Sequence, residues 1–295
     1  MTTEFGTVIT AMVTPFTDDL KLDLDTMAKL TDRLIDMGSD GLLVTGTTGE
    51  SPTLNFDEKV ALWETVIRTA RGRVPIMLGT GTNNTQDCIA LTRKAQEVGG
   101  DAILLVSPYY NKPPQNALYE HFKAVANVTS LPVMIYNVPG RTGCNIDPET
   151  VISLANDVPN IVALKEAGGS IDQASEICRR APTCFTVYSG DDSFTLPLLA
   201  VGAKGIVSVA SHLVAGQIRE MIASFGKGQW ETAKNIHQSL FPVFKGLFFT
   251  TSPAPVKAGL KLIGFPVGGL RPPLLPLTAQ EEEYLDGILE EAGLR

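Results

Sequence analysis

A lysine at the end of a short apolar run is the first candidate for chemistry in this sequence. Lys165 follows Ile161-Val162-Ala163-Leu164, and the run is bounded by Pro159-Asn160 and by Gly168-Gly169-Ser170. This pattern predicts a strand buried on both faces. A lysine with an ordinary pKa of about 10.4 is protonated at pH 7, whereas burial lowers that pKa by several units. A neutral amine here would attack carbonyl carbons and form Schiff bases.

The local sequence also allows a simpler role for Lys165. Its flexible stem would then carry the ammonium out of the strand end to pair with Glu166 or another carboxylate. The polar loops elsewhere in the chain favour the nucleophile over the ion pair.

A loop of small residues and hydroxyls, Gly46-Thr47-Thr48-Gly49-Glu50-Ser51, follows another apolar run. Its glycines allow the backbone to approach a ligand closely. Consecutive N–H groups and the two threonine hydroxyls would form a small cradle for a carboxylate. The alternative is an ordinary turn that leads into a helix.

A tyrosine and an arginine stand close together in Tyr136-Asn137-Val138-Pro139-Gly140-Arg141-Thr142-Gly143. The Tyr136 hydroxyl suits proton transfer, and the Arg141 guanidinium suits bidentate binding of a carboxylate. A salt bridge on a surface turn is the simpler interpretation of Arg141.

Two further loops complete the set. Ser107-Pro108-Tyr109-Tyr110-Asn111-Lys112-Pro113-Pro114 is a stiff loop with two tyrosines, which could equally form a packing or interface patch. Ser189-Gly190-Asp191-Asp192 lies where many barrels hold a phosphate. Its two carboxylates would repel a phosphate, which disfavours a pyridoxal-phosphate or sugar-phosphate role for Lys165. Taken together, the loops suit an enzyme that acts on a small 2-oxo acid.

Elements that could position these loops recur along the chain as short apolar runs separated by amphipathic segments. The predicted strands are Val8–Val13, Gly41–Thr45, Pro75–Gly79, Asp101–Val106, Pro132–Asn137, Ile161–Lys165, Phe185–Ser189 and Gly205–Val209. Parallel strands need long crossovers, and eight strand–helix units close a (β/α)8 TIM barrel. The absence of a G-x-G-x-x-G motif disfavours a doubly wound open sheet. In a barrel the loops after the strands gather on one face, and the candidate residues lie in those loops.

The chain after the eighth strand predicts helices only. They span Gln229–Phe249, Ala254–Ile263 and Thr278–Glu291. We therefore expect a catalytic barrel domain over residues 1–227 and a C-terminal helical domain over residues 228–295.

Composition excludes several classes of function. The 295 residues are 44% hydrophobic and carry a net charge of −8 without a basic run, which argues against nucleic-acid and anionic-membrane partners. No apolar stretch reaches the roughly 18 residues of a membrane span, and the first residues do not resemble a signal peptide, so we expect a cytoplasmic protein.

The cysteines and histidines do not group as metal ligands. The four cysteines lack C-x-x-C spacing and are interpreted as free thiols: Cys88, Cys144, Cys178 and Cys184. The three histidines form no H-x-H or H-E-x-x-H cluster. We expect neither a metal nor another cofactor.

Three motifs together resemble a known family. Gly46-Thr47-Thr48-Gly49-Glu50, Tyr136 to Thr142 and Leu164-Lys165-Glu166 are similar to the signatures of the pyruvate-dependent class I aldolase and lyase family. The resemblance covers essentially the whole chain. It is closest to the branch that condenses pyruvate with aspartate-4-semialdehyde in diaminopimelate and lysine biosynthesis.

The resemblance implies catalytic roles for four residues. Lys165 matches the Schiff-base lysine, and Tyr136 matches the general acid/base. The Thr47 hydroxyl would link Tyr136 to Tyr110, which in this family enters from the neighbouring subunit. A homo-oligomer is therefore implied, and the family suggests a tetramer built as a dimer of dimers.

The same resemblance implies the substrate-binding positions. The backbones of Thr47 and Thr48 would hold the pyruvate carboxylate, and Arg141 would receive the carboxylate of the semialdehyde. The backbone carbonyl of Val207 would lie near pyruvate, and Gly190 is the remaining substrate-binding candidate.

Many members of this family bind lysine as an inhibitor at a dimer interface. The matching positions here are Ser51, Pro52, Phe56, Lys59, Asn83, Asp87 and Tyr109. Lysine-sensitive bacterial enzymes commonly have histidine at the positions of Phe56 and Lys59, and glutamate at that of Asp87. We therefore expect weak or absent feedback inhibition.

Two other functions are compatible with the sequence. The first is an N-acetylneuraminate or 2-keto-3-deoxy sugar-acid lyase of the same family, which Thr48 and Arg141 disfavour. The second is a non-catalytic keto-acid sensor, which the complete set of catalytic residues disfavours.

Overall fold

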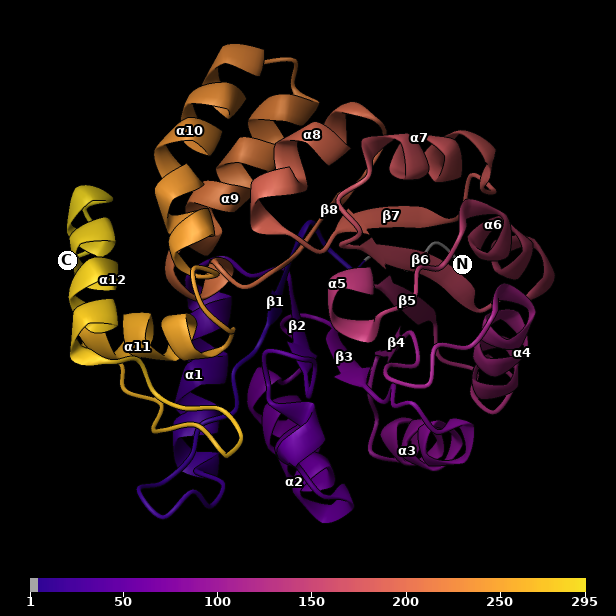
Figure 1. Cartoon of the computed structure of the whole chain (residues 1–295), viewed down its shortest axis with the longest axis horizontal. Helices are drawn as coiled ribbons and strands as arrows, with labels where there is room; N and C mark the ends of the chain where they lie inside the picture. The colour runs from indigo at the N-terminus through magenta and orange to yellow at the C-terminus, as the bar shows by residue number, and fades with distance from the viewer. Residues whose placement is uncertain (1–4) are drawn as a thin grey trace.

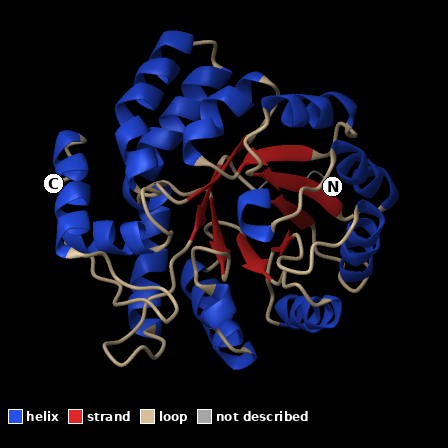
Figure 2. Cartoon of the chain, viewed as in Figure 1, coloured by secondary structure: helices blue, strands red, loops and turns tan. Residues whose placement is uncertain are grey.

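The computed structural model describes residues 5–295, and its centre is a closed barrel of eight parallel strands (Figure 1, Figure 2). The strands pair in chain order, and β8 lies beside β1. They are β1 (Val8–Ala11), β2 (Gly41–Val44), β3 (Ile76–Gly79), β4 (Ala102–Val106), β5 (Val133–Asn137), β6 (Ile161–Glu166), β7 (Thr186–Ser189) and β8 (Gly205–Ser208). The predicted (β/α)8 barrel and each of its strands are confirmed.

Helices surround the barrel, as the blue ribbons outside the red strands of Figure 2 show. They are α1 (Leu24–Asp36), α2 (Phe56–Ala70), α3 (Thr85–Glu97), α4 (Gln115–Ala126), α5 (Pro139–Thr142), α6 (Pro148–Asp157), α7 (Ile171–Arg180), α8 (Thr195–Ala200), α9 (Ser211–Gly226), α10 (Trp230–Gly246), α11 (Ala254–Leu262) and α12 (Ala279–Glu291). Two short 3₁₀ helices, η1 (Ser51–Thr53) and η2 (Asp192–Phe194), follow β2 and β7. Within residues 5–295, no helix is both long enough and apolar enough to cross a membrane.

Alternating side chains along the strands form two separate cores. On β6, Ala163 belongs to the cluster inside the barrel, whereas Leu164 belongs to the cluster between strands and helices. Tyr136, Tyr188 and Val207 also lie in the inner cluster. Because side chains alternate along a strand, Lys165 is on the same face as Ala163 and projects toward the barrel interior.

Two helices differ from the sequence-based expectation. The short helix α5 occupies a segment that was expected to be a loop, since a Pro-Gly pair usually marks a turn. Pro139 begins α5 and Gly143 ends it in a left-handed conformation with φ 72°, which are favourable positions for these residues. Helix α9 begins at Ser211, directly after the expected strand Gly205–Val209 and Ala210, and contains a kink at Val214.

The C-terminal helices lie at one side of the barrel, where Figure 1 draws α11 and α12 in yellow. Helix α10 packs against α9, and α12 packs against α10 and α11. The expected domain boundary at residues 227 and 228 falls in the connection between α9 and α10, and the division into two domains stays a prediction.

The segment after α11 returns to the loops that follow β1 and β2. The Phe16 N–H donates a hydrogen bond to the Val267 carbonyl over 3.1 Å. Gly268 has φ 75°, and a Cβ atom there would lie 1.8 Å from the Phe16 carbonyl oxygen. Only glycine fits this close approach, so the tail is held against the catalytic face of the barrel.

Candidate active site

Lys165 is buried at the catalytic end of β6, with only 5% of its surface exposed. It is paired in register with Tyr136 on β5, and its Nζ lies 4.2 Å from the centroid of the Tyr136 ring. Burial lowers the pKa of Lys165 to about 7; the positive Arg141 also lowers it, and the Asp192 carboxylate opposes the shift. A substantial fraction of this amine is therefore neutral and nucleophilic at neutral pH.

The adjacent carboxylate of Glu166 is occupied by other partners. It accepts hydrogen bonds from Asn137 Nδ2 at 3.1 Å, from Gln173 Nε2 at 3.0 Å and from the Gly168 N–H. Burial raises the pKa of Glu166, and these donors oppose the shift. Within residues 5–295 no ion pair joins Lys165 to Glu166, and the side chain is buried instead of extending out of the strand end. Alternation along β6 is the physical reason, because neighbouring side chains point to opposite faces.

Tyr136 is a buried phenol beside this amine. Burial raises its pKa to about 12, while Arg141 and a hydrogen bond with the Thr47 side chain act in the opposite direction. The phenol therefore keeps its proton at neutral pH and is able to act as a general acid.

The loop that contains Thr47 and Thr48 has a left-handed residue at each end. Thr45 has φ 56° and Glu50 has φ 55°, an uncommon conformation for residues other than glycine. The Thr45 hydroxyl accepts a hydrogen bond from Trp63 Nε1 at 2.8 Å and lies 3.0 Å from the Gly79 carbonyl oxygen. Strained backbone persists where surrounding contacts hold it, and it is common at ligand-binding loops.

Gly190 lies directly against the stem of Lys165. A Cβ atom at Gly190 would lie 3.0 Å from Lys165 Cε and 2.8 Å from the Ala167 Cβ. The glycine thus leaves the space that the lysine side chain occupies.

Asp192, the nearby carboxylate, is buried and has its own donors. It accepts hydrogen bonds from the Ser208 hydroxyl and from the N–H groups of Val209 and Ala210, at 3.2 and 3.1 Å. Its negative charge acts on Lys165 through space. Val207 is buried inside the barrel on the neighbouring strand β8.

A cavity of about 250 Å³ opens beside these residues. Thr47, Tyr136 and Arg141 line it, and so do four of the candidate allosteric residues: Ser51, Pro52, Lys59 and Tyr109. The other three, Phe56, Asn83 and Asp87, do not line this cavity, and Phe56 and Asp87 are exposed. The two candidate sites therefore share one cavity within a single protomer.

Tyr110 lies outside the cavity of its own chain. It is 88% exposed, has φ 76°, and does not line the cavity. Its backbone N–H donates to the Thr142 carbonyl over 3.3 Å. This placement leaves the phenol available to a neighbouring molecule.

Sequence reasoning missed a polar network that supports the loop carrying Arg141. Asn137 accepts a hydrogen bond from the Ile146 N–H at 3.0 Å and donates to Asn145 Oδ1 at 2.8 Å. It also donates to Glu166, so both ends of the loop are tied to β6. Side chains alternate between the two faces of a strand, so Glu166 had to lie on the opposite face of β6 from Lys165. That alternation could have identified Glu166 as part of a separate polar network outside the barrel interior.

Comparison with known proteins agrees with this geometry. The sequence model of the Dihydrodipicolinate synthetase family matches residues 4–292. A curated 4-hydroxy-tetrahydrodipicolinate synthase from Desulforamulus reducens is 54% identical over 293 residues, which cover 99% of both chains. A crystal structure of a Bacillus anthracis dihydrodipicolinate synthase has 51% identity and a TM-score of 0.95, covering 97% of this chain and 98% of that one. A Cyanidioschyzon merolae structure with lysine bound has 45% identity and a TM-score of 0.97, covering 99% of each chain. With a match over nearly its full length, this chain belongs to the Dihydrodipicolinate synthetase family.

Proposed function

We propose that this chain condenses pyruvate with L-aspartate-4-semialdehyde to give 4-hydroxy-tetrahydrodipicolinate, through a Schiff base at Lys165. The observation that carries the proposal is the buried Lys165 amine, with a pKa of about 7, beside the protonated phenol of Tyr136. Curated relatives with 54% and 52% sequence identity to this chain are named 4-hydroxy-tetrahydrodipicolinate synthase, which supports the choice of substrates. The expected cytoplasmic location stays a prediction.

The first half-reaction uses the neutral amine. Lys165 Nζ attacks the pyruvate carbonyl carbon, and the resulting carbinolamine loses water as Tyr136 supplies a proton to the leaving hydroxyl. The protonated imine withdraws electrons from the adjacent methyl group and makes its protons more acidic. Loss of one of these protons gives the enamine.

The second half-reaction forms the ring. The enamine carbon attacks the aldehyde carbon of the second substrate, whose oxygen takes up a proton. The substrate amine then attacks the imine carbon and displaces Lys165, which regenerates the free enzyme. One water molecule is released per product.

The remaining residues would bind and orient the substrates. In this proposal, the backbones of Thr47 and Thr48 hold the pyruvate carboxylate, with the Val207 carbonyl and Gly190 beside the imine. Arg141, at the exposed edge of the cavity, receives the carboxylate of the semialdehyde.

Borohydride reduction tests the central step. Pyruvate and borohydride together should add a pyruvate-derived group to Lys165, as peptide mass analysis would show, and borohydride alone should not. A parallel assay with N-acetylneuraminate should show no cleavage. Absence of a pyruvate-dependent adduct would overturn the proposed mechanism.

The pH dependence of the first step provides a second test. Because imine formation needs the neutral amine and the pKa of Lys165 is about 7, the trapping rate at low pyruvate should fall about tenfold per unit as pH drops below 7. Above pH 8 the rate should level off. A rate that continued to rise toward pH 10 would show that this amine has an ordinary pKa.

We also propose a homotetramer, arranged as a dimer of dimers in which Tyr110 enters the partner's site. The 88% exposure of Tyr110 and its left-handed backbone support this proposal. In an isolated protomer the proton relay through Thr47 would lack its third member.

Weak feedback inhibition is proposed from the surroundings of Lys59. Its side chain is 7% exposed and lines the cavity, and burial lowers its pKa while Cys88 and Asp87 oppose the shift. While Lys59 is charged, a lysine effector bound nearby would place a second ammonium against it. Two like charges about 4 Å apart repel by about 4 kcal/mol at an effective dielectric constant of 20.

L-Lysine should therefore inhibit only above about 1 mM, an affinity of about 4 kcal/mol. Titration of L-lysine into an assay coupled to product formation measures this value. The Lys59→His variant is the matched comparison, because it removes the lysine ammonium and should increase sensitivity. Half-inhibition of the unaltered enzyme well below 1 mM would contradict the proposal.

A further inference from the structure

The carboxylate of Glu50, the last residue of the Gly46–Glu50 loop, is bound by the C-terminal tail. Its Oε1 lies 2.6 Å from Lys257 Nζ, and its Oε2 accepts a hydrogen bond from the Arg271 backbone N–H at 3.0 Å. The side chains of Glu50 and Lys257 are 0% and 3% exposed. A buried carboxylate is costly unless it is paired, so the conformation of Glu50 depends on these two contacts.

Lys257 is fixed from several directions. Its Nζ also donates to the Gly269 carbonyl at 2.7 Å and lies 4.4 Å from the centroid of the Phe16 ring. Helix α11 places the base of the side chain, and the loop after β1 provides the aromatic face. The ammonium therefore has little freedom to follow Glu50 if the loop moves.

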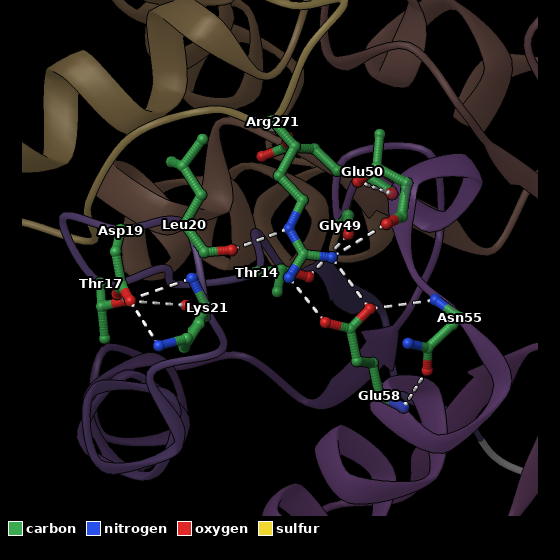
Figure 3. Close-up of polar contacts among 11 residues, drawn as sticks. Thr14, Thr17, Asp19, Leu20, Lys21, Gly49, Glu50, Asn55, Glu58 and Arg271 are labelled. Carbon is green, nitrogen blue, oxygen red and sulfur yellow. Dashed lines mark hydrogen bonds and ion pairs between the residues drawn. The ribbon is translucent and has the colours of Figure 1, made fainter.

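Arg271 ties the tail to three segments of the barrel (Figure 3). Its Nε donates to the Leu20 carbonyl at 3.0 Å, and its Nη1 donates to the Thr53 carbonyl at 2.9 Å. Both Nη atoms donate to the Glu58 carboxylate, at 2.9 and 2.6 Å. The guanidinium thus holds the loop after β1, the end of η1 and the first turn of α2 in one arrangement.

Backbone hydrogen bonds connect Glu50 to the Thr47–Thr48 pair, the proposed cradle for the carboxylate. The Glu50 N–H donates to the Thr47 carbonyl at 3.0 Å, and the Gly49 N–H donates to the Gly46 carbonyl at 3.1 Å. The Thr14 hydroxyl holds the Gly49 carbonyl at 2.6 Å. Together with the left-handed conformation of Glu50, these hydrogen bonds fix the orientation of the backbone N–H groups of Thr47 and Thr48.

We propose that Lys257 and Arg271 are positioning residues, through which the C-terminal tail fixes the cradle for the carboxylate of the 2-oxo acid. They do not touch the reacting atoms. Lys257 acts through Glu50, whereas the Arg271 side chain acts through Thr53 and Glu58, which follow the cradle loop in η1 and α2. The inference rests on the proposed function, because it takes the Thr47–Thr48 pair as the pyruvate cradle. It predicts that the tail controls affinity for one substrate and leaves the other unaffected, since Arg141 belongs to a different loop.

The test compares Lys257→Met with the unaltered enzyme. We expect kcat/KM for pyruvate to fall on the order of 10²-fold, which is the scale of a misplaced binding group. The loss should come from a higher KM for pyruvate, with kcat nearly unchanged. The KM for aspartate semialdehyde should stay within about twofold of the unaltered value. Trapping of Lys165 by borohydride at saturating pyruvate should remain complete.

Two further variants keep the test decisive if Lys257→Met does not fold. Arg271→Lys retains the charge but loses the paired contact with Glu58, and should also raise KM for pyruvate alone. The double variant Glu50→Gln with Lys257→Met removes both buried charges and should recover part of the lost affinity. The matched control is Lys261→Met, four residues further along α11, where Lys261 forms an exposed pair with Glu282.

The outcomes separate the two proposals. If the unaltered enzyme shows no pyruvate-dependent adduct, the proposed function itself fails. If that adduct forms but folded Lys257→Met and Arg271→Lys keep the normal KM for pyruvate, the positioning role is wrong. Equal increases in KM for both substrates would also overturn it, because they would indicate a general loss of structure.

Discussion

Lys165→Ala is expected to lose turnover by on the order of 10⁴- to 10⁶-fold, the scale seen when a covalent nucleophile is removed. The variant has no amine at this position to form the imine. Among the described residues, Lys59 is the lysine that lines the cavity beside Tyr136, and it would have to replace Lys165 for any adduct to form. The fold should be retained, because the change removes a buried group that prefers water when charged.

The steady-state rate and the pyruvate-dependent adduct are the two measurements. Lys165→Arg is the matched variant: it keeps a positive charge but should be equally inactive, which separates loss of the nucleophile from loss of charge. Lys234→Ala, at an exposed pair with Glu231, should behave as the unaltered enzyme. An adduct with pyruvate in Lys165→Ala would refute the assignment.

Tyr110→Phe should lower kcat by on the order of 10²-fold, the usual effect of removing one proton-transfer group. Stability should be unaffected within the monomer, because the side chain is 88% exposed. Tyr119→Phe is a suitable control, since the Tyr119 hydroxyl donates to Asp157 of the same chain at 2.8 Å and does not line the cavity.

Mixing two inactive variants tests whether Tyr110 acts across an interface. A Tyr110→Phe subunit retains Lys165, and a Lys165→Ala neighbour supplies an intact Tyr110 to that site. Mixed oligomers should therefore regain part of the activity. Failure to regain activity after confirmed subunit exchange would show that Tyr110 does not serve the partner.

The barrel was predictable because its signal is local. Each strand is a short apolar run between turn residues, and the observed β8 (Gly205–Ser208) differs by one residue from the predicted Gly205–Val209. The four-residue helix α5 was not predicted, because its Pro-Gly sequence is equally typical of a turn.

The candidate residues were also local in sequence, but the contacts that hold them are not. Thr45 adopts a left-handed conformation because Trp63 and Gly79 bind its hydroxyl, which nothing near Thr45 in the sequence indicates. Likewise, Glu50 is hydrogen-bonded to Arg271, 221 residues later. Such pairings follow from the closed topology, and a single sequence does not reveal them.

The distance between Glu50 and Arg271 along the chain also orders events during synthesis. A ribosome that adds about 5 to 20 residues per second needs roughly 10 to 45 s to make the intervening 221 residues. Strand β8 emerges earlier and closes the barrel against β1. A nascent chain would therefore have its barrel before Glu50 has either partner, and the pyruvate cradle would be the last part of the enzyme to mature.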